Sequence, residues 1–320
     1  MDYYGQINSS GEPHGIGRMF IHNKGIIEGQ WLNSDPFGYS LKISKDGLLY
    51  VGKFQNGKPN GIGKEIHRKG HYYQGEWKDG KQHGKGKEVF PDGRYYEGDW
   101  LDGCREGFGK DISMDGSIYE GEYSNGYRNG NGEQLYADGA KYEGQWEDDK
   151  RHGKGKNTFS SGAVYEGTYE KGKRSGFGKY TWPSGVVYVG QYKNGVRDGK
   201  GKETHPDSSW YDGYYRDDKR HGRGTEVWPD GTKYEGDYKE DKHNGHGKRT
   251  LADGRWYEGM WENGQPNGQG KRSWPSGAFY VGEFKDGKFN GPGIKYKEDS
   301  TSEEGIWEDG VFKRKIRIKK

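Results

Sequence analysis

Cysteine, long apolar runs and helix signals are all scarce in this sequence. The 320 residues include one cysteine, Cys104, so no disulfide bond can form within the chain. No apolar run approaches the ~18 residues that a membrane-spanning helix needs. The segment from Met1 to Ser10 lacks the basic-then-apolar pattern of a secretory signal. We therefore expect a cytoplasmic protein without disulfide bonds.

Hydrophobic residues are also few, and the charge is nearly balanced. Hydrophobic residues make up 28% of the chain and 60 residues are glycine, a composition that is typical of disorder. Aromatic residues, however, make up 15%, and the glycines occupy fixed columns, which low-complexity segments lack. We expect a folded chain that buries aromatic rings. The net charge of +3, from 52 basic and 49 acidic residues, does not indicate a nucleic-acid partner.

A tyrosine recurs every 23 residues over most of the chain, and the same register reaches Ile27 before the run and Glu303 after it. Its positions are Tyr50, Tyr73, Tyr96, Tyr119, Tyr142, Tyr165, Tyr188, Tyr211, Tyr234, Tyr257 and Tyr280. A fixed period of this size indicates a repeat architecture. Such a chain leaves little room for a separate catalytic domain, and no singular nucleophile, base or metal cluster interrupts the period. We therefore predict a protein that is not an enzyme and has no cofactor.

Each repeat has the pattern of one β-hairpin. In the segment from Tyr73 to Trp77, Tyr, Gly and Trp alternate with polar residues, which predicts a strand with one buried face. A turn begins at Lys78, and the paired glycines Gly84 and Gly86 are expected to open a second strand. Pro91-Asp92-Gly93 is then expected to form a tight turn into the next repeat. Asp149, Asp218 and Asp241 replace a turn glycine, and aspartate tolerates a left-handed backbone.

The predicted fold class is all-β. We expect an elongated single-layer antiparallel array of β-hairpins, with about 12–13 repeats of 23 residues. Residues 1–26 are predicted to form an N-terminal cap with a partial repeat, 27–302 the repeat array, and 303–320 a degenerate repeat and basic tail. The glycine within each first strand is expected to leave a slot for rings from adjacent hairpins. The predicted repeat core includes Tyr73, Trp77, Tyr96, Trp100, Tyr142, Trp146, Tyr257 and Trp261.

The repeated phrase resembles a known family. Tyr96-Glu97-Gly98-Asp99-Trp100, followed by Gly107-Phe108-Gly109, is similar to the MORN repeat, and about eleven strong copies run from Tyr50 to Gly293. The resemblance implies a β-hairpin array that acts as a non-enzymatic scaffold in a cytoskeletal or ciliary assembly, such as the axonemal radial spoke. It also implies partners among the proteins of that assembly, and a homodimer formed through terminal repeats.

Basic residues along one edge suggest an alternative. The predicted basic edge lies at the longer turn of each hairpin and includes Lys58, Lys81, Arg105, Arg128, Arg151, Arg174, Arg197, Arg220 and Lys242. The predicted basic tail includes Lys313, Arg314, Lys315, Arg317, Lys319 and Lys320. Together they could bind acidic phospholipids, in particular phosphoinositides, and make the chain a peripheral membrane adaptor. The competing interpretation is a solvated turn edge whose charge is neutralised by aspartates such as Asp79 and Asp102.

Overall fold

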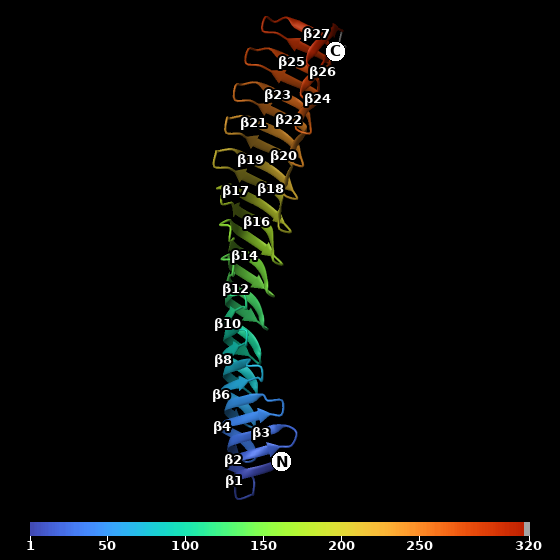
Figure 1. Cartoon of the computed structure of the whole chain (residues 1–320). Coiled ribbons are helices and arrows are strands. Elements are labelled where there is room, and N and C mark those ends of the chain that lie inside the picture. The colour runs from blue at the N-terminus through green and yellow to red at the C-terminus, as the bar shows by residue number, and fades with distance from the viewer. Residues whose placement is uncertain (317–320) are drawn as a thin grey trace. The chain divides into compact units, whose positions relative to one another are not determined.

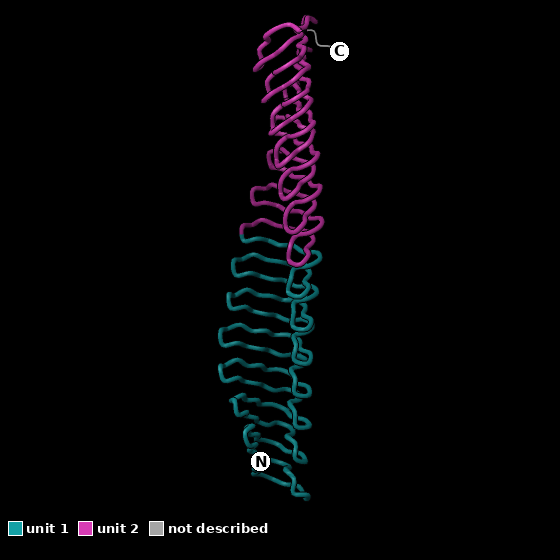
Figure 2. The backbone as a smooth tube through the Cα atoms, turned by 90° about the vertical axis from the view of Figure 1, so that its right-hand side faces the viewer, with its two compact units in different colours: residues 1–160 teal, residues 161–320 magenta. Residues whose placement is uncertain are grey.

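The computed structural model describes residues 1–316, which contain 28 β-strands and no helix (Figure 1). The chain divides into two compact units, Met1–Ser160 and Ser161–Lys320, which are coloured separately in Figure 2. In the described part of the chain, no helix has the length and apolar character needed to cross a membrane.

The first unit contains strands β1 to β14. Their bounds are β1 (Asp2–Ile7), β2 (Pro13–Ile21), β3 (Gly25–Leu32), β4 (Asp35–Ser44), β5 (Leu49–Gln55), β6 (Lys58–Ile66), β7 (Tyr72–Lys78), β8 (Lys81–Val89), β9 (Tyr95–Leu101), β10 (Cys104–Ile112), β11 (Ile118–Ser124), β12 (Tyr127–Leu135), β13 (Lys141–Glu147) and β14 (Lys150–Thr158).

The second unit contains strands β15 to β28. Their bounds are β15 (Val164–Glu170), β16 (Lys173–Thr181), β17 (Val187–Lys193), β18 (Val196–Thr204), β19 (Trp210–Arg216), β20 (Lys219–Val227), β21 (Lys233–Lys239), β22 (Lys242–Thr250), β23 (Trp256–Glu262), β24 (Gln265–Ser273), β25 (Phe279–Lys285), β26 (Lys288–Tyr296), β27 (Ser302–Glu308) and β28 (Val311–Lys315).

Within each unit, every strand pairs antiparallel with the next strand along the chain. In the hairpin of β9 and β10, Arg105 lies opposite Trp100 and Gly109 lies opposite Gly98. The next pairing, β10 with β11, continues the same sheet, with Gly109 opposite Gly121. The predicted all-β array of antiparallel hairpins is therefore confirmed, with one hairpin in each repeat.

One of the two turns differs from the prediction. The turn expected to be the longer one is a two-residue link, Asp102–Gly103, where both residues have positive φ (49° and 93°), as in a type I′ hairpin turn. Asp149, Asp218 and Asp241 occupy the second position of such turns with φ of 63°, 66° and 66°, so the prediction of a left-handed backbone there is confirmed.

At the other end of the hairpin, the expected tight turn is confirmed, because the Gly93 N–H donates to the Phe90 carbonyl (3.1 Å) and Gly93 has a φ of 91°. Pro91-Asp92-Gly93 is part of a longer connection from Phe90 to Arg94, closed by a hydrogen bond from the Phe90 N–H to the Arg94 carbonyl (2.9 Å). The local Asp-Gly signal is the same at both ends, so it does not distinguish the two connections.

The paired glycines were expected to open the second strand, but they lie within it. Strand β10 begins at Cys104, directly after the tight turn, and the pairing with β9 shifts register between Arg105 and Gly109. Gly107 has a φ of 65° at this shift, a left-handed conformation that suits a β-bulge and favours glycine. The bulge lets Arg105 belong to the strand rather than to a loop.

The glycine slot is filled by a ring of the same hairpin rather than of an adjacent one. Tyr96 lies across the glycine pair Gly98 and Gly109, and a Cβ atom on Gly109 would come within 2.4 Å of the Tyr96 ring. The Tyr96 hydroxyl donates a hydrogen bond to the Asp99 carbonyl (3.0 Å). Glycine is needed at both paired positions because the ring occupies the space of their side chains.

The second ring of each repeat joins neighbouring hairpins. Trp100 meets Tyr96 of its own repeat and Tyr73 of the preceding repeat edge-to-face, with centroid distances of 5.3 and 5.1 Å. Its indole N–H donates to the Gly86 carbonyl, also in the preceding repeat (3.3 Å). We call this alternation of rings the ring ladder. All eight rings predicted for the core are buried, with at most 6% of their surface exposed.

Candidate functional site: the ring face and its arginines

Each unit has a ring face and an opposite face. On the ring face, Tyr96, Gly98 and Trp100 of one strand lie beside Arg105 and Gly109 of the next. The opposite face carries charge pairs between neighbouring strands, such as Lys87 with Glu97 (2.8 Å) and Lys248 with Glu258 (3.2 Å). Exposed pairs of this kind contribute about 0.2–1 kcal/mol each, so the opposite face is a solvated, mixed-charge surface.

The predicted basic edge separates into two columns with different surroundings. Lys58, Lys81 and Lys242 are exposed and each begins the second strand of its hairpin, directly after a two-residue turn. The arginines stand one position later, on the ring face. The placement of all nine residues at one longer turn is therefore wrong. We call the second group the arginine column, which comprises Arg105, Arg128, Arg151, Arg174, Arg197 and Arg220.

In the first unit, Arg105 shows how a guanidinium is held on the ring face. It stacks over Tyr96, with 4.4 Å from its central carbon to the ring centroid. It donates to Asp111 of its own strand (2.6 Å) and to Glu88 of the preceding repeat (3.2 Å). Burial opposes its charge, but the two carboxylates outweigh that effect and raise the pKa of Arg105. Its side chain is 20% exposed, so it is part of the packed face rather than a free basic ridge.

Neighbouring arginines keep the stacking and vary the polar partner. Arg128 lies over Trp146 (4.5 Å) and donates to Gln134 (2.8 Å). In the second unit, Arg174 lies over Tyr192 (5.0 Å) and donates to the Gly195 carbonyl (2.6 Å). In the first unit, Arg151 donates to Asn157 (3.2 Å). Stacking on a ring is thus common to these arginines, whereas their polar partners lie either six residues later or in the next tight turn, as Asp149 does for Arg128 (3.0 Å).

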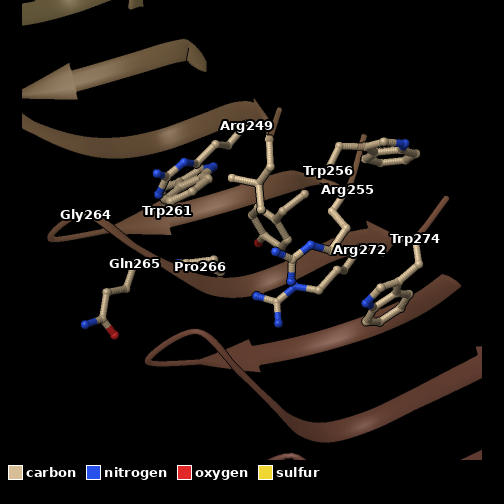
Figure 3. Close-up of a pocket in the computed structure, with 11 residues that line it drawn as sticks. Arg249, Arg255, Trp256, Trp261, Gly264, Gln265, Pro266, Arg272 and Trp274 are labelled. Atoms are coloured by element: carbon tan, nitrogen blue, oxygen red, sulfur yellow. The ribbon is translucent and has the colours of Figure 1, made fainter. Parts of the chain in front are cut away.

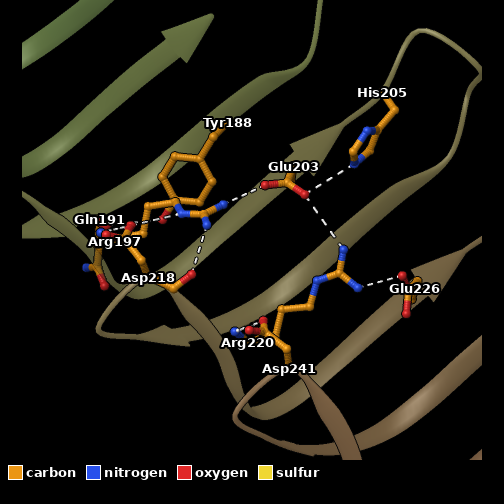
Figure 4. Close-up of polar contacts among 9 residues, drawn as sticks. All are labelled: Tyr188, Gln191, Arg197, Glu203, His205, Asp218, Arg220, Glu226 and Asp241. Carbon is orange, nitrogen blue, oxygen red and sulfur yellow. Dashed lines mark hydrogen bonds and ion pairs between the residues drawn. The ribbon is translucent and has the colours of Figure 1, made fainter. Parts of the chain in front are cut away.

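Two repeats of the second unit form a chain of arginine–carboxylate bonds (Figure 4). Arg197 donates to Glu203 (2.5 Å) and to Asp218 of the next tight turn (3.1 Å). The other oxygen of Glu203 faces Arg220 of the next repeat (3.7 Å), and Arg220 donates to Glu226 (2.5 Å). Glu203 therefore lies between the guanidinium groups of two successive repeats.

The electrostatics of this network follow from its partners. Burial alone would raise the pKa of Glu226, but hydrogen bonds from His243 and Arg220 outweigh burial and lower it. Burial alone would lower the pKa of Arg220, but Glu226 outweighs that effect and the pKa is raised. Both groups are held in their charged forms, so the network is satisfied internally.

The charge at the carboxylate position reverses in the next two repeats. The position that holds Glu203 and Glu226 holds Arg249 and then Arg272, each at the same place opposite the ring-face tyrosines. The arginine column ends there, since His243 and Pro266 stand at its next two positions. This part of the ring face therefore carries two guanidinium groups where the preceding repeats carry carboxylates.

A cavity of about 380 Å³ lies at this reversal (Figure 3). Its walls include the rings Tyr257, Trp261 and Trp274 together with Arg249 and Arg272. Arg255 also lines it and is bound to Asp253 (2.7 Å). None of the described residues that line the cavity carries a carboxylate. We call this cavity the Arg249–Arg272 cleft.

The two guanidinium groups of the cleft are incompletely satisfied. The Nε atom of Arg249 is buried and has no hydrogen-bond partner within residues 1–316, and the group lies over Trp228 (5.2 Å). Arg272 donates to the Gly287 carbonyl (3.0 Å) and lies over Phe284 (5.2 Å). Burial lowers the pKa of Arg272, and Arg255 adds to that effect. Arg249 interacts electrostatically with the exposed Asp230 carboxylate, but among the described residues neither guanidinium group of the cleft forms a hydrogen bond or ion pair with a carboxylate.

Sequence reasoning missed both the carboxylates of the network and the arginines of the cleft. Glu203, Glu226, Arg249 and Arg272 all stand 15 residues after a tyrosine of the 23-residue column. A comparison of that single position from repeat to repeat shows the change of sign. The change of sign is therefore visible in the sequence. It indicates a site only once the structure shows that this position lies on the ring face.

The predicted basic tail is in part a strand. Lys313, Arg314 and Lys315 belong to β28, where Arg314 lies opposite Ile306 and Lys313 is 3.5 Å from Glu308. The prediction of a tail is wrong for these three residues. Arg317, Lys319 and Lys320 lie outside the described residues.

Other candidate chemistry is sparse in the part of the chain that the structure describes. The Cys104 thiol is exposed at the start of β10. Within residues 1–316, no three His, Cys, Asp or Glu side chains are grouped so that they could hold a metal ion.

The comparison with protein families identifies the repeat. The model of the MORN repeat matches eleven consecutive segments, at residues 50–72, 73–93, 96–117, 119–141, 142–164, 165–187, 188–210, 211–233, 234–254, 257–279 and 280–302. The chain belongs to the MORN-repeat family. MORN repeats are structural repeats that bind proteins or lipids. The resemblance seen in the sequence is thereby confirmed, and the MORN repeats place one hairpin in each 23-residue period.

Comparisons with individual proteins add little to the MORN assignment. No curated protein matches the chain. Among solved structures, the wild-type TCP10 domain of Danio rerio CPAP is 13% identical, covering 61% of this chain and 92% of that one, with a TM-score of 0.35. The SAS-4 TCP domain of Drosophila melanogaster, solved in complex with a proline-rich motif of Ana2, is 16% identical over 56% of this chain and 90% of that one, with a TM-score of 0.29. At these TM-scores neither likeness carries an argument about this chain.

Proposed function

We propose that this MORN-repeat protein is a non-enzymatic scaffold that binds partner proteins along its ring face, in a cytoskeletal or ciliary assembly such as a radial spoke. The observation that carries the proposal is the repetition of one unit on the ring face, a partly exposed arginine stacked on a buried tyrosine, as Arg105 is on Tyr96. Successive units are one hairpin apart, roughly 10 Å at the usual strand spacing. A partner would thus meet the same chemistry at regular intervals.

The composition of the ring face supports protein binding. Arginine, tyrosine and tryptophan are the residues enriched in the energetically dominant parts of protein interfaces. On this face they are held in place before any partner arrives, because each guanidinium is fixed by a ring and a polar group, as Arg105 is by Tyr96 and Asp111. Side chains that are already ordered lose less conformational entropy on binding.

The test is localisation in the native cell. The tagged full-length chain should remain with filament structures after detergent extraction, and proximity labelling should mark filament or axonemal proteins. A chain that is extracted completely and labels no such protein would contradict the cytoskeletal proposal.

A second candidate, binding of acidic phospholipids, is supported by the exposed lysines Lys58, Lys81 and Lys242. Sedimentation with vesicles that contain a phosphoinositide, over a range of salt concentrations, tests it. The membrane adaptor would be favoured by salt-sensitive binding that is lost when the three lysines are replaced by glutamine. The same binding should be kept when Lys87, on the opposite face, is replaced by glutamine. If the protein sedimented equally with neutral vesicles and with phosphoinositide vesicles, specific binding of acidic phospholipids would be contradicted.

A homodimer through terminal repeats is a further part of the proposal. Large apolar side chains are exposed on the first two strands, with Tyr4 66% and Ile16 68% accessible. Light scattering on the full chain should give twice the monomer mass of 36.4 kDa. A monomer mass over the whole accessible concentration range would contradict dimer formation.

A further inference from the structure

We propose that the Arg249–Arg272 cleft binds a carboxylate side chain, glutamate or aspartate, from an acidic segment of a partner protein. The proposal rests on the proposed scaffold function and names the partner chemistry at one place on the ring face. It is built from the charge reversal, the internal arginine–carboxylate network and the shape of the cleft.

The ring face of the second unit already holds carboxylates between guanidinium groups. In the preceding repeats of the same unit, a carboxylate occupies the space between successive guanidinium groups, as Glu203 does between Arg197 and Arg220 (Figure 4). The bond between Arg197 and Glu203 is short, 2.5 Å, as expected for a charge-assisted hydrogen bond. The ring face thus already holds guanidinium–carboxylate pairs in this aromatic setting.

The two guanidinium groups of the cleft are also incompletely hydrogen-bonded. The position that holds carboxylates in the preceding repeats holds the cations Arg249 and Arg272 in these two repeats. The position of the arginine column holds His243 and Pro266 in the same two repeats. A cation that is shielded from water costs free energy unless an anion or several hydrogen bonds compensate it. Arg249 keeps a buried Nε atom without a partner, and Arg272 has one backbone acceptor in the described structure. An incoming carboxylate would supply the acceptors that both groups lack.

The size of the cleft and its ring walls also suit an amino-acid side chain. A volume of about 380 Å³ is at the small end of the range for ligand sites and suits one or two amino-acid side chains. In Figure 3 the guanidinium groups of Arg255 and Arg272 lie at the centre, with Trp274 to one side and Trp261 to the other. Indole walls beside the cations would pack against an apolar or proline residue next to the carboxylate.

A peptide fits this site better than a membrane surface does. Recognition of acidic lipids typically uses clusters of four to eight exposed basic residues. The cleft has two guanidinium groups without a carboxylate partner among the described contacts, and Arg255 is bound to Asp253. Its cations are recessed among rings rather than displayed on an edge. A single acidic side chain matches that arrangement in both charge and size.

The experiment uses the full chain and a defined probe. The probe is a fluorescein-labelled, capped peptide with two glutamates flanked by prolines, and its partner peptide has glutamine in both acidic positions. Fluorescence anisotropy measures binding to the wild type and to the variants Arg249→Gln and Arg272→Gln. The matched control is Lys271→Gln, which removes the same charge from the residue next to Arg272 but on the opposite face, where Lys271 lies over Phe279.

The proposal predicts binding of the glutamate peptide that is about tenfold or more tighter than that of the glutamine peptide. Each arginine variant should weaken binding about tenfold, a difference of about 1.4 kcal/mol, and Lys271→Gln should stay within about twofold. Thermal melting of each variant shows whether it is folded. If Arg249→Gln or Arg272→Gln does not fold, the comparison of the two peptides still decides the outcome. The wild type and the Lys271→Gln control should then both bind the glutamate peptide more tightly than the glutamine peptide.

Two results would overturn the proposal. One is equal binding of the glutamate and glutamine peptides up to about 1 mM, the limit of a weak interaction. The other is loss of phosphoinositide-vesicle binding in the two arginine variants with no change in peptide binding, which would assign the cleft to a lipid phosphate. Either result leaves the localisation test of the scaffold unaffected, so failure of the cleft and failure of the scaffold are distinguishable.

Discussion

Arg272 occupies the position in its repeat that Glu226 occupies two repeats earlier, and both lie opposite ring-face tyrosines. Glu226 accepts a hydrogen bond from Arg220 at 2.5 Å, whereas Arg272 contacts a backbone carbonyl and aromatic rings. One position on one face thus carries a compensated charge in one repeat and an uncompensated charge in another. Neutralising an arginine in the compensated pair and in the uncompensated position should therefore change the stability of the protein differently.

Arg220→Gln should destabilise the protein, and Arg272→Gln should not. Removing Arg220 takes the bonded guanidinium from Glu226 and leaves Glu203 with Arg197 alone. Breaking a pair that is about one-fifth exposed should cost about 2 kcal/mol. Removing Arg272 relieves a desolvated charge, so its variant should be neutral or up to about 1 kcal/mol more stable. Urea unfolding followed by tryptophan fluorescence measures both. An equal loss in the two variants would show that the ring face does not distinguish paired from unpaired guanidinium groups.

The glycine beneath each tyrosine should tolerate no side chain. Gly109→Ala places a Cβ atom 2.4 Å from the Tyr96 ring, so we expect a loss of about 3 kcal/mol. Gly93→Ala is the control, because its Cβ atom would meet nothing within 4 Å and only its φ of 91° is unfavourable. That strain should cost about 1 kcal/mol. Melting temperatures of the two variants decide the order, and a larger loss for Gly93→Ala would contradict the packing of Tyr96 across the glycine pair.

The hydroxyl of the repeated tyrosine should contribute measurably to stability. Tyr96→Phe removes the donor to the Asp99 carbonyl and should cost about 1 kcal/mol, the usual value of one buried hydrogen bond. Tyr95→Phe changes the neighbouring residue, whose ring lies on the opposite face beneath Lys87, and should cost less than about 0.5 kcal/mol. Denaturant midpoints measured side by side give the comparison. Equal midpoints for the two variants would mean that the hydrogen bond adds nothing.

Alkaline pH should unfold the repeats through their buried tyrosines. Burial raises the pKa of Tyr142, Tyr165 and Tyr280 from 10.0 to about 12. The folded state therefore favours the protonated ring, and its advantage is complete below pH 10 and lost as the pH rises toward 12 and above. Stability should be flat from pH 8 to about 10 and then fall steeply. Tyrosinate absorbance and circular dichroism recorded together test this, and full ionisation at pH 10–11 with the fold intact would contradict it.

The sequence predicts the regular parts of this protein well because they depend on local alternation. Tyr73, Gly75 and Trp77 alternate with polar residues, and that pattern alone predicts a strand with buried rings. The tight turn at Pro91-Asp92-Gly93 was predicted correctly, whereas the turn that begins at Lys78 was expected to be longer than the two-residue link Asp79–Gly80 that the structure has. Strand pairing, which links distant residues, decides which becomes the two-residue turn.

The arginines and the cleft were beyond the local pattern. Arg105 was placed in a loop because Gly107 and Gly109 suggest a strand boundary, whereas the structure continues the strand through a bulge at Gly107. The cleft depends on side chains from successive repeats and on the sign of one column, which changes at Arg249. Neither property is contained in a single copy of the repeat.

The ring ladder also has a mechanical consequence. Trp100 touches tyrosines of two successive repeats, so detaching one hairpin breaks ring contacts and strand pairing on one side and leaves the next hairpin intact. Under a stretching force applied to either unit, hairpins would peel away one at a time from the exposed strand. Each event would release 23 residues, about 80 Å of extended chain. A scaffold of this kind would lengthen under load in uniform steps and keep its remaining binding surface.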